Sequence, residues 1–147
     1  MPRYFTLDEA RAALPVVGRS IREAVQARQL YREADTLIRD LAQRILMAGG
    51  MHVDNVRTEA WKAQLDGSAS TLKSAMERIE QLGVLVKDLD TGLVDFPTLF
   101  KGEEVYLCWR MDEADISHWH GINEGFAGRR EIDGNFVDNH SGGPSFD

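Results

Sequence analysis

The chain has 147 residues, with 24 acidic and 17 basic side chains and a formal net charge of −7. This length fits one domain with an ordinary core, in which about two-thirds of the unfolded surface becomes buried. Hydrophobic residues make up 43% and charged residues 28% of the chain, as is typical of globular proteins. No apolar run approaches the roughly 20 residues that span a bilayer, so we expect no membrane segment.

The cysteine content and the N-terminal sequence both favour a cytoplasmic protein. Cys108 is the only cysteine, so the chain forms no internal disulfide, which agrees with a reducing compartment. The N-terminal sequence MPRYFTLDEARAALP lacks the apolar segment of a signal peptide. The acidic net charge argues against a surface that binds polyanions broadly, and arginines at positions 19, 22, 28, 32, 39 and 44 leave a nucleic-acid role open.

A long helix is predicted for the first third of the chain, where apolar or small residues recur at steps of three and four. Thr6 and Glu9 form a capping box at its start. Pro15 lacks an amide and presses on the carbonyl four residues back, so we expect a short first helix or a kink there. The helix should then run to about Ala48 and stop at Gly49–Gly50, with one glycine left-handed. The stripe consists of Leu7, Ala10, Leu14, Val17, Ile21, Ala24, Tyr31, Ile38, Ala42 and Ile45.

A second amphipathic helix follows a short connection, capped by Asp54 or Asn55 and ending near Leu82. Gly67 inside it favours a fray or bend. The two helices make an antiparallel hairpin about 40 Å long, which outruns a small sheet. Part of the apolar stripe therefore needs another partner, and we expect a homodimer through the helices. The stripe of the second helix consists of Trp61, Leu65, Ala69, Leu72, Met76 and Ile79.

The second half of the chain changes from helical to alternating periodicity and predicts a meander of four antiparallel strands. The expected strands are residues 84–89, 93–96, 104–110 and 116–120. Gly92 suits a left-handed turn position, and Pro97 is expected to end the second strand. The fold class is therefore α+β: a long helical hairpin, kinked near Pro15, followed by the meander. We expect residues 1–132 to form a single domain and the polar, glycine-rich residues 133–147 to be a disordered tail.

Several motifs together make the chain recognisable: VKDLDTGLVDFP, EVYLCWR, HWH and GFAGRR, with the opening FTLDEA and the helix stop ILMAGG. The chain resembles a bacterial family of unknown function, the domain of unknown function numbered twenty-two hundred and three. The similarity covers about Tyr4 to Ile132. It implies the domain limits and a bacterial setting, and it implies no activity. The pair Trp119-His120 fits the family pattern, whereas His118 is not a required member, and Asp112-Glu113 stands where a Gly-Glu pair is common.

His118 and His120 are candidate ligands of a divalent transition metal such as zinc. They are two residues apart on a predicted strand, so their side chains share one face. A third ligand must then come from the neighbouring strand, where Cys108 or Glu104 can supply it, or from a second subunit. The alternative is a strand with one exposed and one packed histidine.

Asp88, Asp95 and Arg110 form a candidate polar cluster around the first hairpin. A two-residue turn places Asp88 opposite Asp95, a like-charge pair that needs a metal or a shared proton. A three-residue turn at residues 90–92 places Lys87 opposite Asp95 as a salt pair, and the position of Gly92 favours this register. Arg110 is the strand residue best placed to reach a shared carboxylate.

Arg129, Gly125 and Gly128 form a candidate anion site after the last predicted strand. Glycines let backbone amides converge, and an adjacent arginine can complete such a site. The alternative is a turn that places Phe126 on the core. Cys108, between Leu107 and Trp109, is interpreted as core filler rather than a nucleophile.

Two functions therefore remain in view. The first is a non-enzymatic, self-associating interaction module. The second is a small metal- or His/Asp-dependent enzyme with a site on the sheet around Asp95, Arg110, His118 and His120. The sequence identifies no ligand, substrate or partner.

Overall fold

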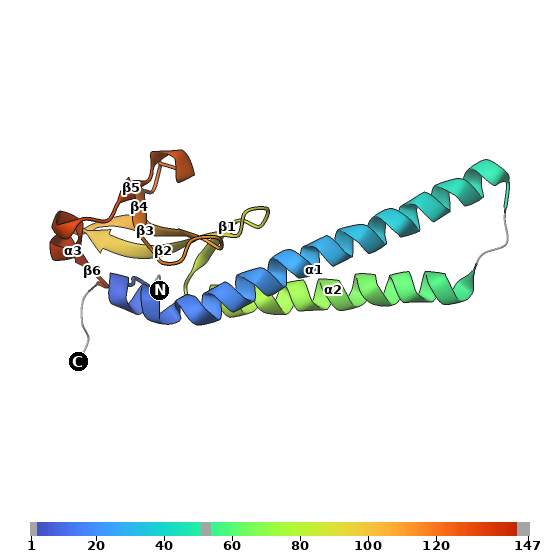
Figure 1. Cartoon of the computed structure of the whole chain (residues 1–147), viewed down its shortest axis with the longest axis horizontal. Coiled ribbons are helices and arrows are strands. Elements are labelled where there is room, and N and C mark those ends of the chain that lie inside the picture. The colour runs from blue at the N-terminus through green and yellow to red at the C-terminus, as the bar shows by residue number, and fades with distance from the viewer. Residues whose placement is uncertain (1–2, 51–53, 144–147) are drawn as a thin grey trace. The chain divides into compact units, whose positions relative to one another are not determined.

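A computed structural model describes residues 3–50 and 54–143 of the chain. It divides into two compact units, the first made of residues 1–22 and 76–147 and the second of residues 23–75. Figure 1 labels helix α1 (Leu7–Ala48) and helix α2 (Asn55–Gln81). Each helix contributes residues to both units. Within the described residues, no helix is both long and apolar enough to cross a membrane.

The start of α1 confirms the predicted capping box. The Glu9 amide donates to Thr6 Oγ1 and the Thr6 amide donates to Glu9 Oε1, each at 3.1 Å. The helix continues through Pro15 without interruption, so the alternative of a separate short first helix does not form. The position of Pro15 still removes one backbone hydrogen bond from the helix interior.

Glycines end α1 as expected. Gly49 and Gly50 both have positive φ, 69° and 118°. The Gly50 amide donates to the Ile45 carbonyl at 3.0 Å, which is the hydrogen bond of a Schellman motif. The next helix, α2, is capped by Asp54, whose Oδ1 accepts the amides two and three residues later. Gly67 lies inside α2 without breaking it.

The first unit contains an antiparallel sheet whose strands follow the chain in order. They are β1 (Leu85–Asp88), β2 (Leu93–Phe100), β3 (Glu103–Arg110), β4 (His118–Gly121) and β5 (Arg130–Glu131). A last strand, β6 (His140–Ser141), pairs with β2. The predicted meander is therefore present and is extended by two short strands. A 3-10 turn, η1 (Phe126–Gly128), precedes β5, and helix α3 (Gly134–Asn139) precedes β6.

The sequence predicts that the second strand ends at Pro97, but β2 continues to Phe100. The Phe5 amide donates to the Pro97 carbonyl at 2.7 Å. Because the nitrogen and oxygen of one strand residue point to the same side, the proline nitrogen faces away from β3. Proline has no amide hydrogen to donate, but because its nitrogen faces away from β3, no hydrogen bond of the β2–β3 ladder is lost.

Neither predicted register of the first hairpin forms, because Asp95 lies opposite Leu85. The pairing shifts between Val86 and Asp88, where β1 has a bulge or irregularity. Asp88 closes the loop instead: its Oδ1 accepts the Asp90 amide at 2.9 Å, and its Oδ2 accepts the Thr91 hydroxyl at 3.2 Å. This carboxylate holds a wider turn than the two- or three-residue loops that the sequence predicts.

Residues 134–141, which were expected to be disordered, form α3 and β6 in the first unit. Phe136 is 1% exposed and stacks on Phe100, with ring centroids 5.2 Å apart. It also lies 4.9 Å from the Trp119 ring. Just beyond α3, His140 Nε2 accepts the Leu7 amide at 3.0 Å and so satisfies a free donor at the start of α1.

The two faces of the sheet differ in chemistry. Phe96 packs edge-on against Phe5, with ring centroids 5.3 Å apart, and Trp109 lies beside Gly18 of α1. The face that carries these aromatic residues is the apolar core, and its buried members are Val94, Phe96, Thr98, Val105, Leu107 and Trp109. Because strand residues alternate in direction, Asp95 and Cys108 lie on the opposite face.

The packing of α3 generates a stability test. Phe136→Ala should lower the free energy of unfolding by about 3–5 kcal/mol, because it removes a buried ring from between two aromatic neighbours. Val137 lies in the same helix but is 45% exposed, so Val137→Ala is the matched control and should change stability by about 0.5 kcal/mol or less. Urea unfolding measures both. Equal stabilities of the two variants would contradict the packing of residues 134–141.

Candidate functional site

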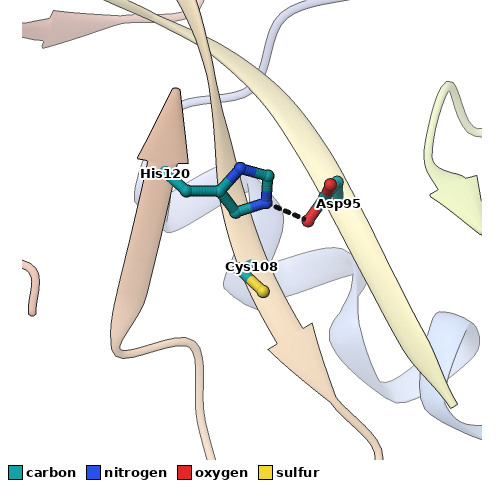
Figure 2. A group of neighbouring side chains, drawn as sticks. All are labelled: Asp95, Cys108 and His120. Atoms are coloured by element: carbon teal, nitrogen blue, oxygen red, sulfur yellow. Dashed lines mark hydrogen bonds and ion pairs between the residues drawn. The ribbon is translucent and has the colours of Figure 1, made fainter. Parts of the chain in front are cut away.

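Three adjacent strands bring one polar side chain each to the face of the sheet opposite the apolar core. Asp95 of β2 lies directly opposite Cys108 of β3. His120 of β4 lies opposite Tyr106, the next residue of β3 on that face. We call Asp95, Cys108 and His120 the Asp–Cys–His cluster, and Figure 2 shows the three side chains side by side.

The cluster is compact and almost fully buried. Asp95, Cys108 and His120 have exposed fractions of 1%, 0% and 4%. One carboxylate oxygen, the thiol sulfur and one imidazole nitrogen all lie within 4.8 Å of one another. Polar groups removed from water in this way need partners, because an unpaired buried carboxylate or imidazolium is strongly unfavourable.

The hydrogen bonds of His120 indicate where the protons of the cluster lie. Nδ1 lies 2.8 Å from the Gly121 carbonyl oxygen, which only accepts, so Nδ1 carries a proton. Nε2 lies 3.0 Å from Asp95 Oδ1, and this contact is a hydrogen bond when one proton lies between the two atoms. Neither ring nitrogen is then free to take a proton from a substrate, so His120 in this arrangement is not a general base.

Burial shifts the acid–base behaviour of the other two groups. Desolvation raises the pKa of Asp95, and His120, Lys87 and the Cys108 thiol oppose that rise. Burial, reinforced by the negative charge of Asp95, raises the pKa of Cys108 to about 12. Arg129 acts in the opposite direction but does not offset it. Cys108 is therefore a thiol at neutral pH rather than a nucleophilic thiolate.

A largely buried ion pair lies beside the cluster. Glu113 accepts two hydrogen bonds from Arg129, each 2.9 Å long, and a third from the Arg110 amide at 2.8 Å. Burial acts to raise the pKa of Glu113, but the Arg129 guanidinium and the Arg110 amide outweigh it, so that the pKa is lowered. His118 Nδ1 lies 3.9 Å from Glu113 Oε2, and its electrostatic interaction also acts to lower the pKa of Glu113.

The two predicted histidines take different positions. Both lie on the face that carries Cys108, as the register of β3 and β4 shows. His120 belongs to the cluster, whereas His118 is only partly buried and its Nδ1 lies 2.9 Å from Ser117 Oγ. Of the remaining histidines, His140 caps α1, and His52 lies outside the described residues.

The predicted polar cluster of Asp88, Asp95 and Arg110 is not brought together. Asp88 closes the first hairpin loop, and Asp95 pairs with His120. Arg110 Nε lies 2.6 Å from Asp112 Oδ1, and its guanidinium lies 4.8 Å from the centre of the Phe126 ring. The sequence named Asp95 and His120 in one candidate site, and they do meet, whereas the hairpin partners expected for Asp95, which were Asp88 or Lys87, depend on a register that does not form.

The groups of the predicted anion site are engaged within the chain. The Gly128 amide donates to the Gly125 carbonyl at 2.9 Å. Arg129 binds Glu113 and also lies over Phe126, 4.1 Å from the ring centre. An anion at this position remains a prediction, and it would have to compete with Glu113 for the guanidinium.

Comparison with protein-family models matches residues 3–132 to a family described as "Uncharacterized conserved protein (DUF2203)". Searches of curated proteins and of solved structures return no match. The family description assigns no activity, substrate or partner, so the chemistry of the site must be argued from the geometry above.

The raised pKa of Cys108 leads to a reactivity test. With a pKa of about 12, only about one thiol in ten thousand is ionised near pH 8. Because the side chain is also buried, iodoacetamide should leave the folded protein unmodified over hours and label it completely in urea. Intact mass spectrometry reads this directly, since the chain has a single cysteine. Labelling of the folded protein at the rate of a free thiol would contradict the burial.

The Glu113–Arg129 pair leads to a pH-dependent stability test. Arg129→Gln should lower the free energy of unfolding by about 2 kcal/mol or more at pH 7, because it leaves Glu113 largely buried without its cation. Since the folded-state pKa of Glu113 is lowered, this contribution is present above the unfolded value of about 4.3. It is lost as the pH falls through the folded pKa, so the gap between the two proteins should narrow in acid.

Arg130→Gln is the matched control for that test. Arg130 pairs with Glu124 at 2.9 Å but is 53% exposed, so its loss should cost less than about 1 kcal/mol. Urea unfolding at several pH values measures all three proteins. A difference between wild type and Arg129→Gln that stays constant down to pH 3 would show that Glu113 does not depend on Arg129.

Proposed function

The chain belongs to the DUF2203 family of uncharacterized conserved proteins, and from this premise we propose that it is a non-enzymatic interaction module that self-associates through its helical hairpin. The supporting observation is the poor burial of large apolar side chains in the second unit, residues 23–75. A second copy of the chain is the partner that the proposal commits to.

Small side chains form the interior of this unit. Its buried residues, among those that the structure describes, are Ala24, Ala27, Ala34, Ser68 and Ala75. Larger apolar residues stay exposed to solvent, with Leu46 and Met47 at 81% and Val56 at 83%. Larger apolar side chains such as Ile38, Trp61 and Leu65 are only half-buried. A pair of helices whose fully buried residues are alanine and serine gains limited stability from its own contacts.

Two exposed leucines form a ridge next to the alanine seam. Leu30 and Leu37 are seven residues apart, and so are Ala27 and Ala34, so the two rows run side by side along α1. Leu30 is 38% and Leu37 is 42% exposed. The Leu30 carbonyl accepts a hydrogen bond from Gln64 Nε2 at 2.8 Å, which ties this part of α1 to α2.

The leucine ridge is the part of the exposed apolar surface that one partner can cover. The large exposed apolar side chains of this unit are Leu30, Tyr31, Leu37, Leu46, Met47 and Val56. At about 100° per residue, Leu30 and Leu37 share one face of α1, whereas Leu46 lies about 160° around the helix from Leu30. Because the same ridge is present on every copy, two hairpins can pack around a twofold axis as a four-helix arrangement.

The surrounding charges support a protein partner rather than nucleic acid. Arg39 pairs with Asp35, and Arg44 pairs with Asp40, each at 3.0 Å along α1. These arginines are therefore neutralised within the helix and do not form a phosphate-binding stripe. The proposal places the protein in a reducing compartment, the cytoplasm, which the single buried cysteine supports.

A second candidate function is a small enzyme with a site on the polar face of the sheet. The observation that favours it is the buried Asp–Cys–His cluster, which core packing alone does not require. Because both nitrogens of His120 are engaged, a metal-free His/Asp mechanism lacks a free base. Metal chemistry is the route by which this cluster could act.

Self-association is tested by mass in solution. Light scattering at high micromolar concentration should return twice the chain mass for the wild type. Leu30→Glu combined with Leu37→Glu should return the monomer mass, because it places charges in the ridge that the partner covers. Ile122 is 53% exposed in the first unit, so Ile122→Glu is the control and should remain dimeric. A monomeric wild type would refute the proposal.

A further inference from the structure

We propose that the Asp–Cys–His cluster is a mononuclear site for a divalent transition metal, of which zinc is the best match. The inference goes beyond self-association and does not depend on it. It gives the second candidate function its chemistry, and its ligands differ from the His118–His120 pair that the sequence suggests. His120 stays a ligand, Cys108 is the third ligand that the sequence offered, and Asp95 takes the place of His118.

The donor set selects the class of metal. One thiol, one imidazole and one carboxylate are the three side-chain types that bind zinc in proteins. Magnesium and calcium prefer oxygen ligands throughout, so a site with sulfur and nitrogen donors disfavours both. Among the residues that the structure describes, this is the group of three such donors close enough to share an ion.

The orientation of His120 is the one that metal ligands adopt. A metal-bound histidine usually donates its second ring N–H to a carbonyl or carboxylate, which fixes the ring and makes the first nitrogen a better ligand. Nδ1 of His120 does this toward the Gly121 carbonyl at 2.8 Å. Nε2 is thereby directed to the space that it shares with Asp95 and Cys108 (Figure 2).

Charge balance favours a doubly charged cation in this buried position. The Asp95 carboxylate and the Cys108 thiolate together carry two negative charges, and a neutral His120 adds none, so an M²⁺ ion makes the site neutral. The neighbouring Arg129 is already balanced by Glu113. Binding displaces the thiol proton of Cys108 and the proton shared by His120 and Asp95, and both leave to solvent.

The distances require only a small adjustment. Metal–ligand bonds of about 2.0–2.3 Å place the ligand atoms of a tetrahedral site about 3.3–3.7 Å apart. The ligand atoms of the cluster lie within 4.8 Å of one another, and the Nε2–Oδ1 pair lies at 3.0 Å, so side-chain shifts of about 1 Å are sufficient. Three protein ligands leave the fourth position to water or a small molecule, as in catalytic zinc sites.

Cobalt(II) is the probe for this site, because thiolate ligation gives it a characteristic near-ultraviolet charge-transfer absorption. The full-length chain, purified without affinity metal, is unfolded with chelator and refolded with cobalt so that the buried site can fill. We expect one cobalt per chain with micromolar or tighter affinity and a thiolate charge-transfer band. Cys108→Ser should abolish the band and weaken binding at least about tenfold, and His120→Ala should weaken it similarly.

His118→Ala is the matched control, since His118 lies on the same strand but outside the cluster. It should keep the band and the affinity. The proposal is overturned if the folded wild type binds no cobalt, if Cys108→Ser keeps the wild-type spectrum, or if His118→Ala loses the band. Because Cys108→Ser changes one atom, it decides the question even if His120→Ala does not fold.

The test separates this inference from self-association, because the stoichiometry is counted per chain. A monomer that binds one cobalt refutes the dimer and leaves the metal site standing. A dimer that binds none refutes the metal site and leaves the dimer standing.

Discussion

The burial of the Asp95 carboxyl group is the constraint on which the sheet depends. This group lies in the middle of β2 with 1% of its surface exposed, and desolvation raises its pKa. A carboxyl group in such a position must have hydrogen-bond donors, and the two that it has come from other strands: the Cys108 thiol and His120. The meander must therefore extend as far as β4, and in the register that brings His120 within reach.

The segment between β3 and β4 maintains that register. Glu113 uses its backbone carbonyl to accept the Trp109 indole N–H at 3.0 Å and its carboxylate to bind Arg129. Ile116, three residues later, is fully buried, so the segment is attached to the apolar core as well as to the polar face. Such double attachment positions a short strand more firmly than its own four residues could.

Local chemistry explains which parts of this architecture could be predicted from the sequence. The capping box of Thr6 and Glu9, the Gly49–Gly50 stop and the Asp54 cap each involve residues within five positions of one another. The left-handed turn at Gly92 is local in the same sense, and alternation alone places His118 and His120 on one face. Signals of this kind do not depend on how the rest of the chain folds.

The features that sequence reasoning missed depend on distant contacts. Strand β2 continues through Pro97, whose carbonyl accepts a hydrogen bond from the amide of Phe5, a residue far away in the chain. Residues 134–141 have a polar composition, but they fold because Phe136 packs against Phe100 and Trp119. The β1 residue opposite Asp95 is Leu85 because the register of β1 shifts beside the Asp88-closed loop, and no turn rule based on Gly92 anticipates that shift.

The two proposals concern different units of the chain, and the difference follows from how each unit is stabilised. The first unit has an aromatic and aliphatic core large enough to support a buried polar cluster on the other face of the same sheet. Among the described residues of the second unit, only alanines and one serine are fully buried and the larger apolar side chains are half-buried or exposed, and isolated helices gain little from such a seam. Its exposed leucines therefore need a cover that the unit itself does not supply, and a second hairpin offers the same chemistry in return. A buried cluster favours a small ion, whereas a long exposed ridge favours another protein surface.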